Sequence, residues 1–190
     1  MRRALLGGTF DPPHIAHLVA AEAAWRQLDV DVVTFLPAGS PWQKAERRVT
    51  HHDHRWHMVL AAVEGIEYFA ADPREVHRDG WTYTVDTLNS FDPADELWLI
   101  LGSDAAANLP TWNRADEVLE RARVAVAPRP GTEAGAVESV LGSVTWLDMP
   151  ALQVSGTEIR ARATAGKSIR FLVPEPVWRY VEEHAIYRPV

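Results

Sequence analysis

The chain has 190 residues, enough for one large domain with a buried core, and its composition of 47% hydrophobic and 24% charged residues is typical of a globular protein. A formal net charge of −7 argues against a broad basic surface for nucleic acid, because such binding depends on neutralised phosphates. The absence of cysteine excludes disulfides, thiolate catalysis and cysteine-bound zinc.

We expect neither a signal peptide nor a membrane anchor at the N-terminus. Arg2 and Arg3 are followed by only a few apolar residues before Gly7, and no stretch of the chain approaches the length that spans a bilayer. We therefore expect a soluble cytoplasmic protein without a membrane partner. One domain over residues 1–190 is the simplest division, with a helical C-terminal part over about residues 155–190.

Short apolar runs alternate along the chain with segments of helical spacing. The apolar runs predict strands at residues 3–6, 30–36, 66–70, 97–101, 124–127 and 144–147. Helical spacing and capping signals predict helices at residues 17–28, 50–63, 84–91, 115–121, 155–165 and 174–184. Thr50 with Asp53 resembles a capping box, as does Ser155 with Glu158, and Thr84 is a candidate cap.

Strands that alternate with helices imply right-handed βαβ units and hence an α/β fold with a doubly wound, mainly parallel sheet and C-terminal helices. Residues 129–143, with three glycines, are the least predictable stretch and are expected to form a loop with a weak helix. Ligands of such sheets bind beyond the carboxyl ends of the strands, where the strand order reverses. The polar motifs of this chain follow predicted strands or open predicted helices, as that rule requires.

The segment GGTFDPPHIAH, residues 7–17, has the character of a phosphate site. Two glycines after a strand allow close approach of the backbone to a ligand, and a helix that opens near His14 offers unpaired amides. His14 and His17 lie three positions apart, so on a helix both can donate to one oxyanion. A plain turn followed by surface histidines is the ordinary structural alternative.

A second candidate phosphate motif is SGTEIR, residues 155–160. A capping box explains Ser155 and Glu158, but it does not explain Thr157 and Arg160, which add a hydroxyl and a fork of donors near the same helix opening. Hydroxyls and guanidinium groups of this kind suit phosphate oxygens.

These motifs resemble those of a known superfamily. Residues 7–17 are similar to the GGTFDPxHxGH signature of the nucleotidyltransferases that share an (H/T)xGH motif with class I aminoacyl-tRNA synthetases, with Ala16 where the family usually has glycine beside the base. Residues 155–160 are similar to the SxTxIR motif of that family, with Gly156 in the second position. The sequences DGWTYTVDTL (79–88), LILGSD (99–104), LPTW (109–112) and the tail over 171–187 resemble elements of nicotinate-mononucleotide adenylyltransferases.

The resemblance implies a Rossmann-like enzyme that transfers the adenylyl group of ATP to nicotinate mononucleotide, giving nicotinate adenine dinucleotide and pyrophosphate in NAD biosynthesis. Mg²⁺ would be carried on ATP, with no metal site of the protein itself. The implied catalytic residues are His14, His17 and Arg160. The implied ATP-binding residues are Gly7, Gly8, Thr9, Phe10, Gly102, Asp104, Ser155 and Thr157. The implied residues for the second substrate are Lys44, Tyr83, Thr84 and Trp112, with Lys44 on its phosphate.

Other functions fit parts of the same pattern. An adenylyltransferase for nicotinamide mononucleotide or phosphopantetheine is the nearest alternative, and a non-catalytic nucleotide-binding or sensing module on the same fold is an alternative of another class. A class I synthetase is disfavoured by the short length, the acidity and the lack of a KMSKS-like loop. The histidines at 51, 52, 54 and 57 form no HExxH pattern and are expected to lie on a structural helix. The sequence leaves open a homo-oligomer, and also the role of Arg129 in an RPG element.

Overall fold

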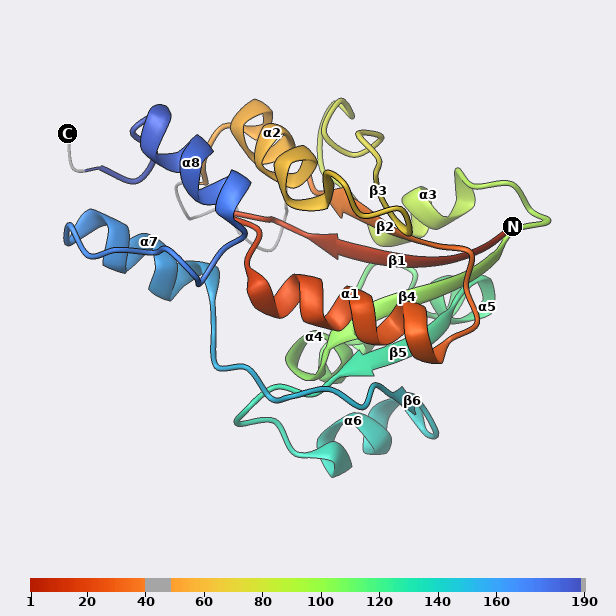
Figure 1. Ribbon diagram of the computed structural model, residues 1–190. Coiled ribbons are helices and arrows are strands. Elements are labelled where there is room, and N and C mark those ends of the chain that lie inside the picture. The colour runs from red at the N-terminus through yellow and green to blue at the C-terminus, as the bar shows by residue number, and fades with distance from the viewer. Residues whose placement is uncertain (40–48, 189–190) are drawn as a thin grey trace.

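The computed structural model describes residues 1–39 and 49–188. Within them one six-stranded sheet has the strand order β3-β2-β1-β4-β5-β6, and every strand pairing is parallel (Figure 1). The strands are β1 (Arg2–Gly8), β2 (Val32–Pro37), β3 (Phe69–Ala71), β4 (Glu96–Gly102), β5 (Arg123–Ala127) and β6 (Thr145–Trp146). The chain builds outward from β1 in one direction and from β4 in the other, so the strand order reverses between these two strands. The predicted doubly wound sheet is confirmed.

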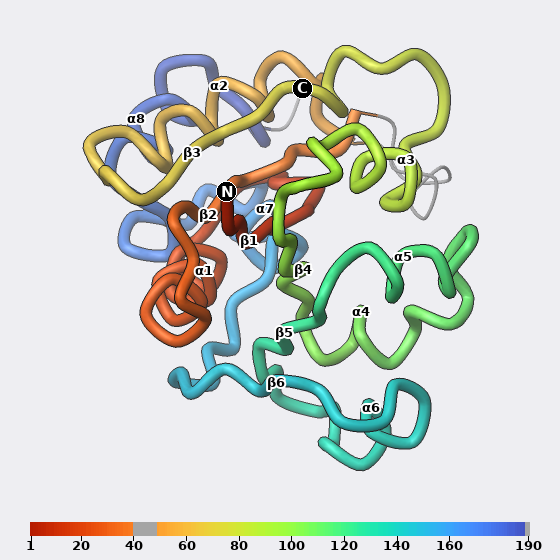
Figure 2. Tube along the Cα trace, turned by 90° about the vertical axis from the view of Figure 1, so that its right-hand side faces the viewer, coloured from red at the N-terminus to blue at the C-terminus, as the bar shows by residue number. Residues whose placement is uncertain are grey.

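Helices cover both faces of the sheet (Figure 2). The helices α1 (Ile15–Gln27) and α2 (His52–Val63) lie on one face. The other face is covered by α3 (Thr84–Asn89), α4 (Ser103–Ala107), α5 (Ala115–Arg121) and α6 (Ala134–Leu141). Because successive side chains of a strand point to opposite faces, Ile100 of β4 packs with α1, whereas Leu99 and Leu101 pack with the helices of the opposite face.

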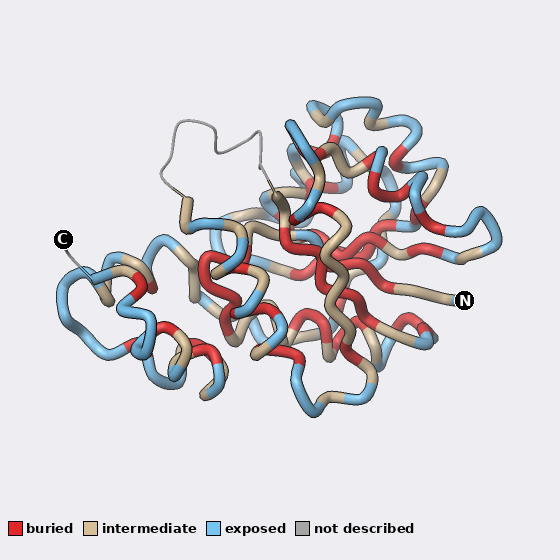
Figure 3. Tube along the Cα trace, turned by 90° about the horizontal axis from the view of Figure 1, so that it is seen from above, coloured by how far each residue is buried: buried red, intermediate tan, exposed pale blue. Residues whose placement is uncertain are grey.

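A third apolar cluster joins α2 to the last two helices, α7 (Gly156–Thr164) and α8 (Glu175–Glu183). Its buried members are Met58, Ala62, Ile159, Ile169, Val173, Val177, Val181 and Ile186. Figure 1 places α7 and α8 beyond the carboxyl ends of the strands, and Figure 3 shows buried residues concentrated in the sheet and on the helix sides that face it. Of the helices described, none combines the length and apolar character needed to cross a bilayer.

Several local expectations were wrong. Thr50 does not cap α2; the N-cap is His51, whose side chain accepts from the amide of Asp53 at 3.4 Å. Thr84 does not cap α3 either, because the N-cap position is Tyr83 and no side chain caps it. The Ser155 cap of α7 is confirmed, since its hydroxyl oxygen accepts from the amide of Glu158 at 3.2 Å.

The lengths of some elements also differ from expectation. Residues 66–68 form a turn after α2 instead of strand, so β3 begins only at Phe69. The stretch 129–143 contains the regular helix α6, which buries Val137. The short helix α4 and the 3₁₀ turn Leu109–Thr111 were not predicted, because five and three residues are too few for a helical pattern to be recognised.

Candidate active site

Three adjoining cavities lie at the carboxyl ends of β1 and β4, where the strand order reverses. The largest, of about 370 Å³, is lined by Gly7, Gly8, Thr9, His17, Tyr83, Thr84, Gly102, Asp104, Trp112 and Arg129, among others. A second, of about 170 Å³, is lined by Thr9, Phe10, Asp11, Pro12, His14, His17, Arg129, Ser155, Gly156, Thr157 and Arg160. We call them the central cavity and the phosphate cavity. Sites at a strand-order reversal are the usual ligand positions of doubly wound sheets.

His14 and His17 are arranged by the start of α1. His14 is the N-cap residue, and its backbone amide donates to Nδ1 of His17 at 3.1 Å. The two rings stack with their centroids 3.7 Å apart. Because Nδ1 of His17 accepts a hydrogen bond, the proton of its neutral ring lies on Nε2, which makes Nε2 a donor. His17 lines both cavities.

His14 is almost fully buried, with 3% of its surface exposed. Burial, and secondarily the positive charge of Arg129, lowers the pKa of His14 to about 4. The ring is therefore neutral at pH 7. Its Nδ1 is buried and has no hydrogen-bond partner among the described residues. A buried polar nitrogen without a partner costs free energy, and a ligand in the phosphate cavity that it lines can supply the missing contact.

Helix α7 forms the opposite wall of the phosphate cavity. Ser155 caps it, and Arg160 donates from Nη1 to the backbone carbonyl of Asp11 at 2.7 Å and from Nη2 to Thr157 Oγ1 at 3.3 Å. The structure therefore brings the two sequence motifs together around one space, although about 140 residues separate them. Helix N-terminal amides, hydroxyls, a guanidinium group and imidazoles form a donor-rich lining that suits phosphate oxygens.

Asp104 and Arg129 meet at the end of β4. The Oδ1 atom of Asp104 lies 3.5 Å from Nε of Arg129, and a Cβ atom on Gly102 would come within 2.6 Å of both. Glycine at 102 is thus required for these side chains to approach. Arg129 lines the central and phosphate cavities and also a third space of about 40 Å³, to which Ala16 contributes. The sequence analysis left the role of Arg129 open, and its only indication was the RPG element at residues 129–131.

The remaining wall of the central cavity is aromatic and rich in hydroxyl groups. Tyr83, Thr84 and Trp112, which the family resemblance implies for the second substrate, all line it. The Trp112 Nε1 atom and the hydroxyl oxygen of Thr82 are buried without a hydrogen-bond partner among the residues described. Glu75 also lines the cavity; burial raises the pKa of its carboxyl group, which accepts from Thr87 Oγ1 at 2.6 Å. Thr82 lies in the segment 79–88 that resembles a family element but was not predicted as a site residue, and Glu75 lies in none of the motifs found in the sequence.

Lys44 falls outside the described residues. Phe10 borders the phosphate cavity, but its ring is 2% exposed and packs against His17 and Phe35 at centroid distances of 4.9 and 5.7 Å. Phe10 therefore supports the turn from inside the core.

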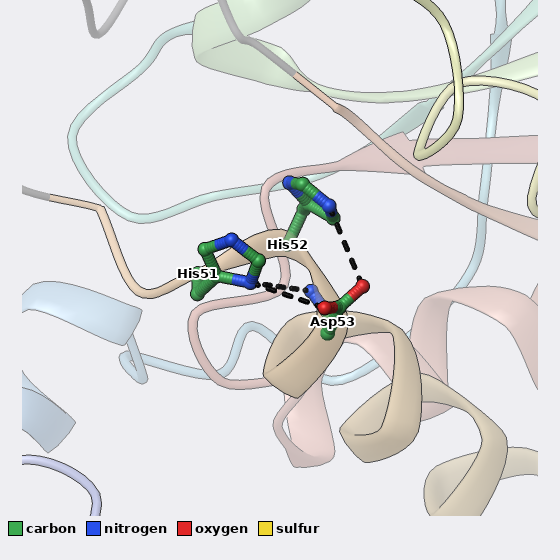
Figure 4. A group of neighbouring side chains, drawn as sticks. All are labelled: His51, His52 and Asp53. Carbon is green, nitrogen blue, oxygen red and sulfur yellow. Dashed lines mark hydrogen bonds and ion pairs between the residues drawn. The ribbon is translucent and has the colours of Figure 1, made fainter.

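A surface group on α2 has the composition of a metal site. The side chains of His51, His52 and Asp53 offer ligand atoms within 4.8 Å of one another (Figure 4). Their contacts have a simpler explanation, because His51 caps the helix and both imidazoles lie 3.4 Å from carboxylate oxygens of Asp53. The positive end of the helix dipole also disfavours a bound cation at this place.

Comparison with known proteins finds relatives over nearly the whole chain. Residues 5–162 match the family model described as cytidylyltransferase-like. A probable nicotinate-nucleotide adenylyltransferase of Salinibacter ruber is 42% identical, covering 97% of both chains, and one of Thermoanaerobacter sp. is 36% identical over 99% of this chain and 95% of its own length. A solved structure of Plasmodium falciparum nicotinic acid mononucleotide adenylyltransferase, complexed with NaAD, has a TM-score of 0.80 at 17% identity, covering 98% of this chain and 97% of its own.

Proposed function

Because the chain belongs to the cytidylyltransferase-like family, and to its nicotinate-nucleotide adenylyltransferases in particular, we propose that it transfers the adenylyl group of ATP to nicotinate mononucleotide. The products are nicotinate adenine dinucleotide and pyrophosphate, as in NAD biosynthesis. One observation carries the proposal: two phosphate motifs line a single cavity, which opens beside a larger cavity with an aromatic wall.

The reaction requires no general base from the protein. The attacking group is a phosphate oxygen of the mononucleotide, which is mostly ionised at neutral pH because the second pKa of a phosphate monoester is about 6. This oxygen bonds to the α-phosphorus of ATP, the bond from that phosphorus to the bridging oxygen of the β-phosphate breaks, and the electron pair leaves with pyrophosphate. Catalysis then consists of alignment and stabilisation of charge on the phosphates.

In this proposal, the phosphates of ATP lie between α1 and α7. His17 donates from Nε2, His14 contributes a neutral imidazole, and Arg160 supplies a fixed positive charge. Gly7, Gly8, Thr9, Phe10, Gly102, Asp104, Ser155 and Thr157 form the rest of the proposed ATP site. Because His14 is neutral, it adds no positive charge to the phosphate cavity of the free enzyme.

The central cavity would hold nicotinate mononucleotide. The ring of this substrate would lie against Tyr83 and Trp112, and Thr84 lines the same cavity. Among the described residues, Trp112 Nε1 and Thr82 Oγ1 are buried there without a hydrogen-bond partner. Lys44 is proposed to pair with the phosphate of this substrate.

Mg²⁺ is proposed to bind to the triphosphate, where it would neutralise charge. The oxygen groups of Asp104, Thr9 and Thr157 on the cavity walls fit this hard cation, directly or through its water. The cytoplasmic location and the assembly state stay predictions.

A pyrophosphate-release assay tests the proposal. The protein is given ATP with nicotinate mononucleotide, nicotinamide mononucleotide or phosphopantetheine, and the first is expected to turn over with the highest kcat/KM. A preference for either of the others would move the protein to the corresponding alternative. Binding of ATP and mononucleotide without pyrophosphate release would instead support the non-catalytic nucleotide-binding module.

Replacement of His17 by alanine is the decisive variant. Loss of a donor to the transferred phosphate should lower kcat about 100-fold or more, while the circular dichroism spectrum stays that of the native protein. The exposed His57 on α2 offers a matched control, since His57→Ala removes an imidazole that lines neither cavity. Near-normal turnover by a folded His17→Ala protein would contradict the assignment.

A further inference from the structure

The C-terminal end of the chain contacts the phosphate motif directly. The hydroxyl of Tyr187 donates to Oδ1 of Asp11 at 2.7 Å, across 176 positions of sequence. Burial, together with the neighbouring Asp11 charge, raises the pKa of the Tyr187 hydroxyl, so it stays protonated and acts as a donor. The backbone of Tyr187 adopts a left-handed φ of 71°, which is unfavourable for an aromatic residue and persists only where tertiary contacts hold it.

Asp11 in turn lies against Arg160 at the phosphate cavity. It is 6% exposed, and its second carboxylate oxygen, Oδ2, accepts from the amide of Thr50 at 3.2 Å. The same Oδ2 lies 4.0 Å from Nη1 of Arg160, and this Nη1 donates to the carbonyl oxygen of Asp11 at 2.7 Å. Both the side chain and the backbone of Asp11 therefore face the guanidinium group of Arg160.

Helix α7 is held by the same pair of residues at its two ends. At its start, a Cβ atom on Gly156 would lie 2.9 Å from the carbonyl oxygen of Asp11, so only glycine allows this close approach without a shift. At its end, Thr164 Oγ1 donates to the carbonyl oxygen of Tyr187 at 3.0 Å. Ile159 is the only residue of α7 that is fully buried, so its apolar anchoring is slight. Beside this apolar contact, Asp11 and Tyr187 fix the two ends of the helix.

A purely structural role for Tyr187 would be to anchor the C-terminus. The neighbouring Ile186 already does this by packing in the third apolar cluster. The ring of Tyr187 packs against the same cluster, a contact that does not need the hydroxyl, whereas burying a carboxylate is costly unless it is hydrogen-bonded. The hydroxyl instead contacts the residue that holds Arg160, which points to a role in the site.

We propose that Tyr187 and Asp11 are positioning residues for adenylyl transfer: the Tyr187 hydroxyl fixes Asp11, and Asp11 fixes Arg160 and the start of α7 at the phosphate cavity. This inference rests on the proposed function. Neither residue contacts the reacting atoms in this account. Their effect is exerted through the guanidinium group of Arg160, whose charge is needed most when negative charge builds up on the leaving pyrophosphate.

Tyr187→Phe is the direct test, because it removes the hydroxyl and keeps the ring. We expect kcat for pyrophosphate release to fall about tenfold, with the KM for nicotinate mononucleotide within about twofold of wild type. Tyr180→Phe is the matched control: that hydroxyl contacts Nδ1 of His54 at 3.0 Å and lines no part of the site, so wild-type kcat is expected.

Combination with Arg160→Ala separates positioning from simple anchoring. If Tyr187 acts through Arg160, Tyr187→Phe adds little further loss of kcat in the Arg160→Ala background. Losses that multiply, or a Tyr187→Phe protein with lower Tm but unchanged kcat, would overturn the inference. Should Tyr187→Phe fail to fold, Thr164→Val removes the hydrogen bond from α7 to the backbone carbonyl oxygen of Tyr187 at an exposed position and should lower kcat in the same sense. Unchanged kcat would count against the inference.

A readout independent of activity distinguishes failure of this inference from failure of the proposed function. The side-chain Nε NMR signal of Arg160 should be single and sharp in the wild-type protein and broadened in Tyr187→Phe. An unchanged signal would refute the positioning role even if the wild-type protein proved inactive. An inactive wild type with a changed signal would refute adenylyl transfer while keeping the Tyr187–Asp11–Arg160 connection.

Discussion

The neutral state of His14 makes the stability of the protein depend on pH in a defined window. Its folded pKa of about 4 lies below its ordinary value of 6.5. Between these values the unfolded chain binds a proton that the folded protein does not, so the free energy of unfolding falls as pH decreases. The gap is about 2.5 pH units, and each unit is worth about 1.4 kcal/mol, so the loss approaches about 3 kcal/mol. It is absent above about pH 6.5 and complete near pH 4.

Denaturant unfolding at a series of pH values measures this loss. The wild-type protein is compared with His14→Asn, which keeps a polar side chain and does not titrate. We expect the difference in unfolding free energy between the two proteins to change by about 3 kcal/mol between pH 7 and pH 4, with wild type losing more. Other titrating groups are common to both proteins and cancel. Parallel curves, or an NMR titration of the His14 ring near its ordinary pKa, would refute the buried neutral imidazole.

Two further predictions concern the walls of the site. Gly156→Ala places a methyl group 2.9 Å from the Asp11 carbonyl oxygen and 3.2 Å from Arg160 Nη1, so kcat/KM should fall at least about tenfold in steady-state assays. Gly135→Ala is the control, because a Cβ atom there would have nothing within 4 Å. Equal activity of the two variants would contradict the close packing at Gly156. Trp112→Phe removes a buried donor and should raise the KM for nicotinate mononucleotide more than the KM for ATP. Equal effects on the two KM values would contradict the placement of the mononucleotide against Trp112.

The sequence predicted the sheet because buried parallel strands have a strong local signal, and the two phosphate motifs are likewise local in sequence. Buried parallel strands are continuous apolar runs, and such runs identified all six strands of the described sheet within a few residues of their ends. The rule that ligands bind where strand order reverses then placed both phosphate motifs at one edge of the sheet. The meeting of His17 and Arg160 at one cavity agrees with that expectation.

Features that depend on tertiary contacts escaped the sequence. Helix α4 is too short for a periodic signal, and α6 lies in a stretch whose glycines favoured a loop. His51 is the N-cap of α2 in place of Thr50, whose backbone amide donates to the distant Asp11. Likewise, no local pattern could show that Arg129 lines three cavities, since strand pairing brings it beside Asp104.

The aspartate of the phosphate motif illustrates how fold and chemistry are combined. A carboxylate beside a triphosphate would by itself repel the substrate. Here Asp11 is covered by Tyr187 and Thr50, and the guanidinium groups of Arg55 and Arg160 lie near enough to interact with it electrostatically. Arg55 is itself buried and donates to the carbonyl oxygen of Thr9 in the same turn. The negative charge of Asp11 thus helps to order the guanidinium groups of Arg55 and Arg160 around the turn. Of these two, Arg160 lines the phosphate cavity, so in the proposed function the substrate contacts a positive charge there.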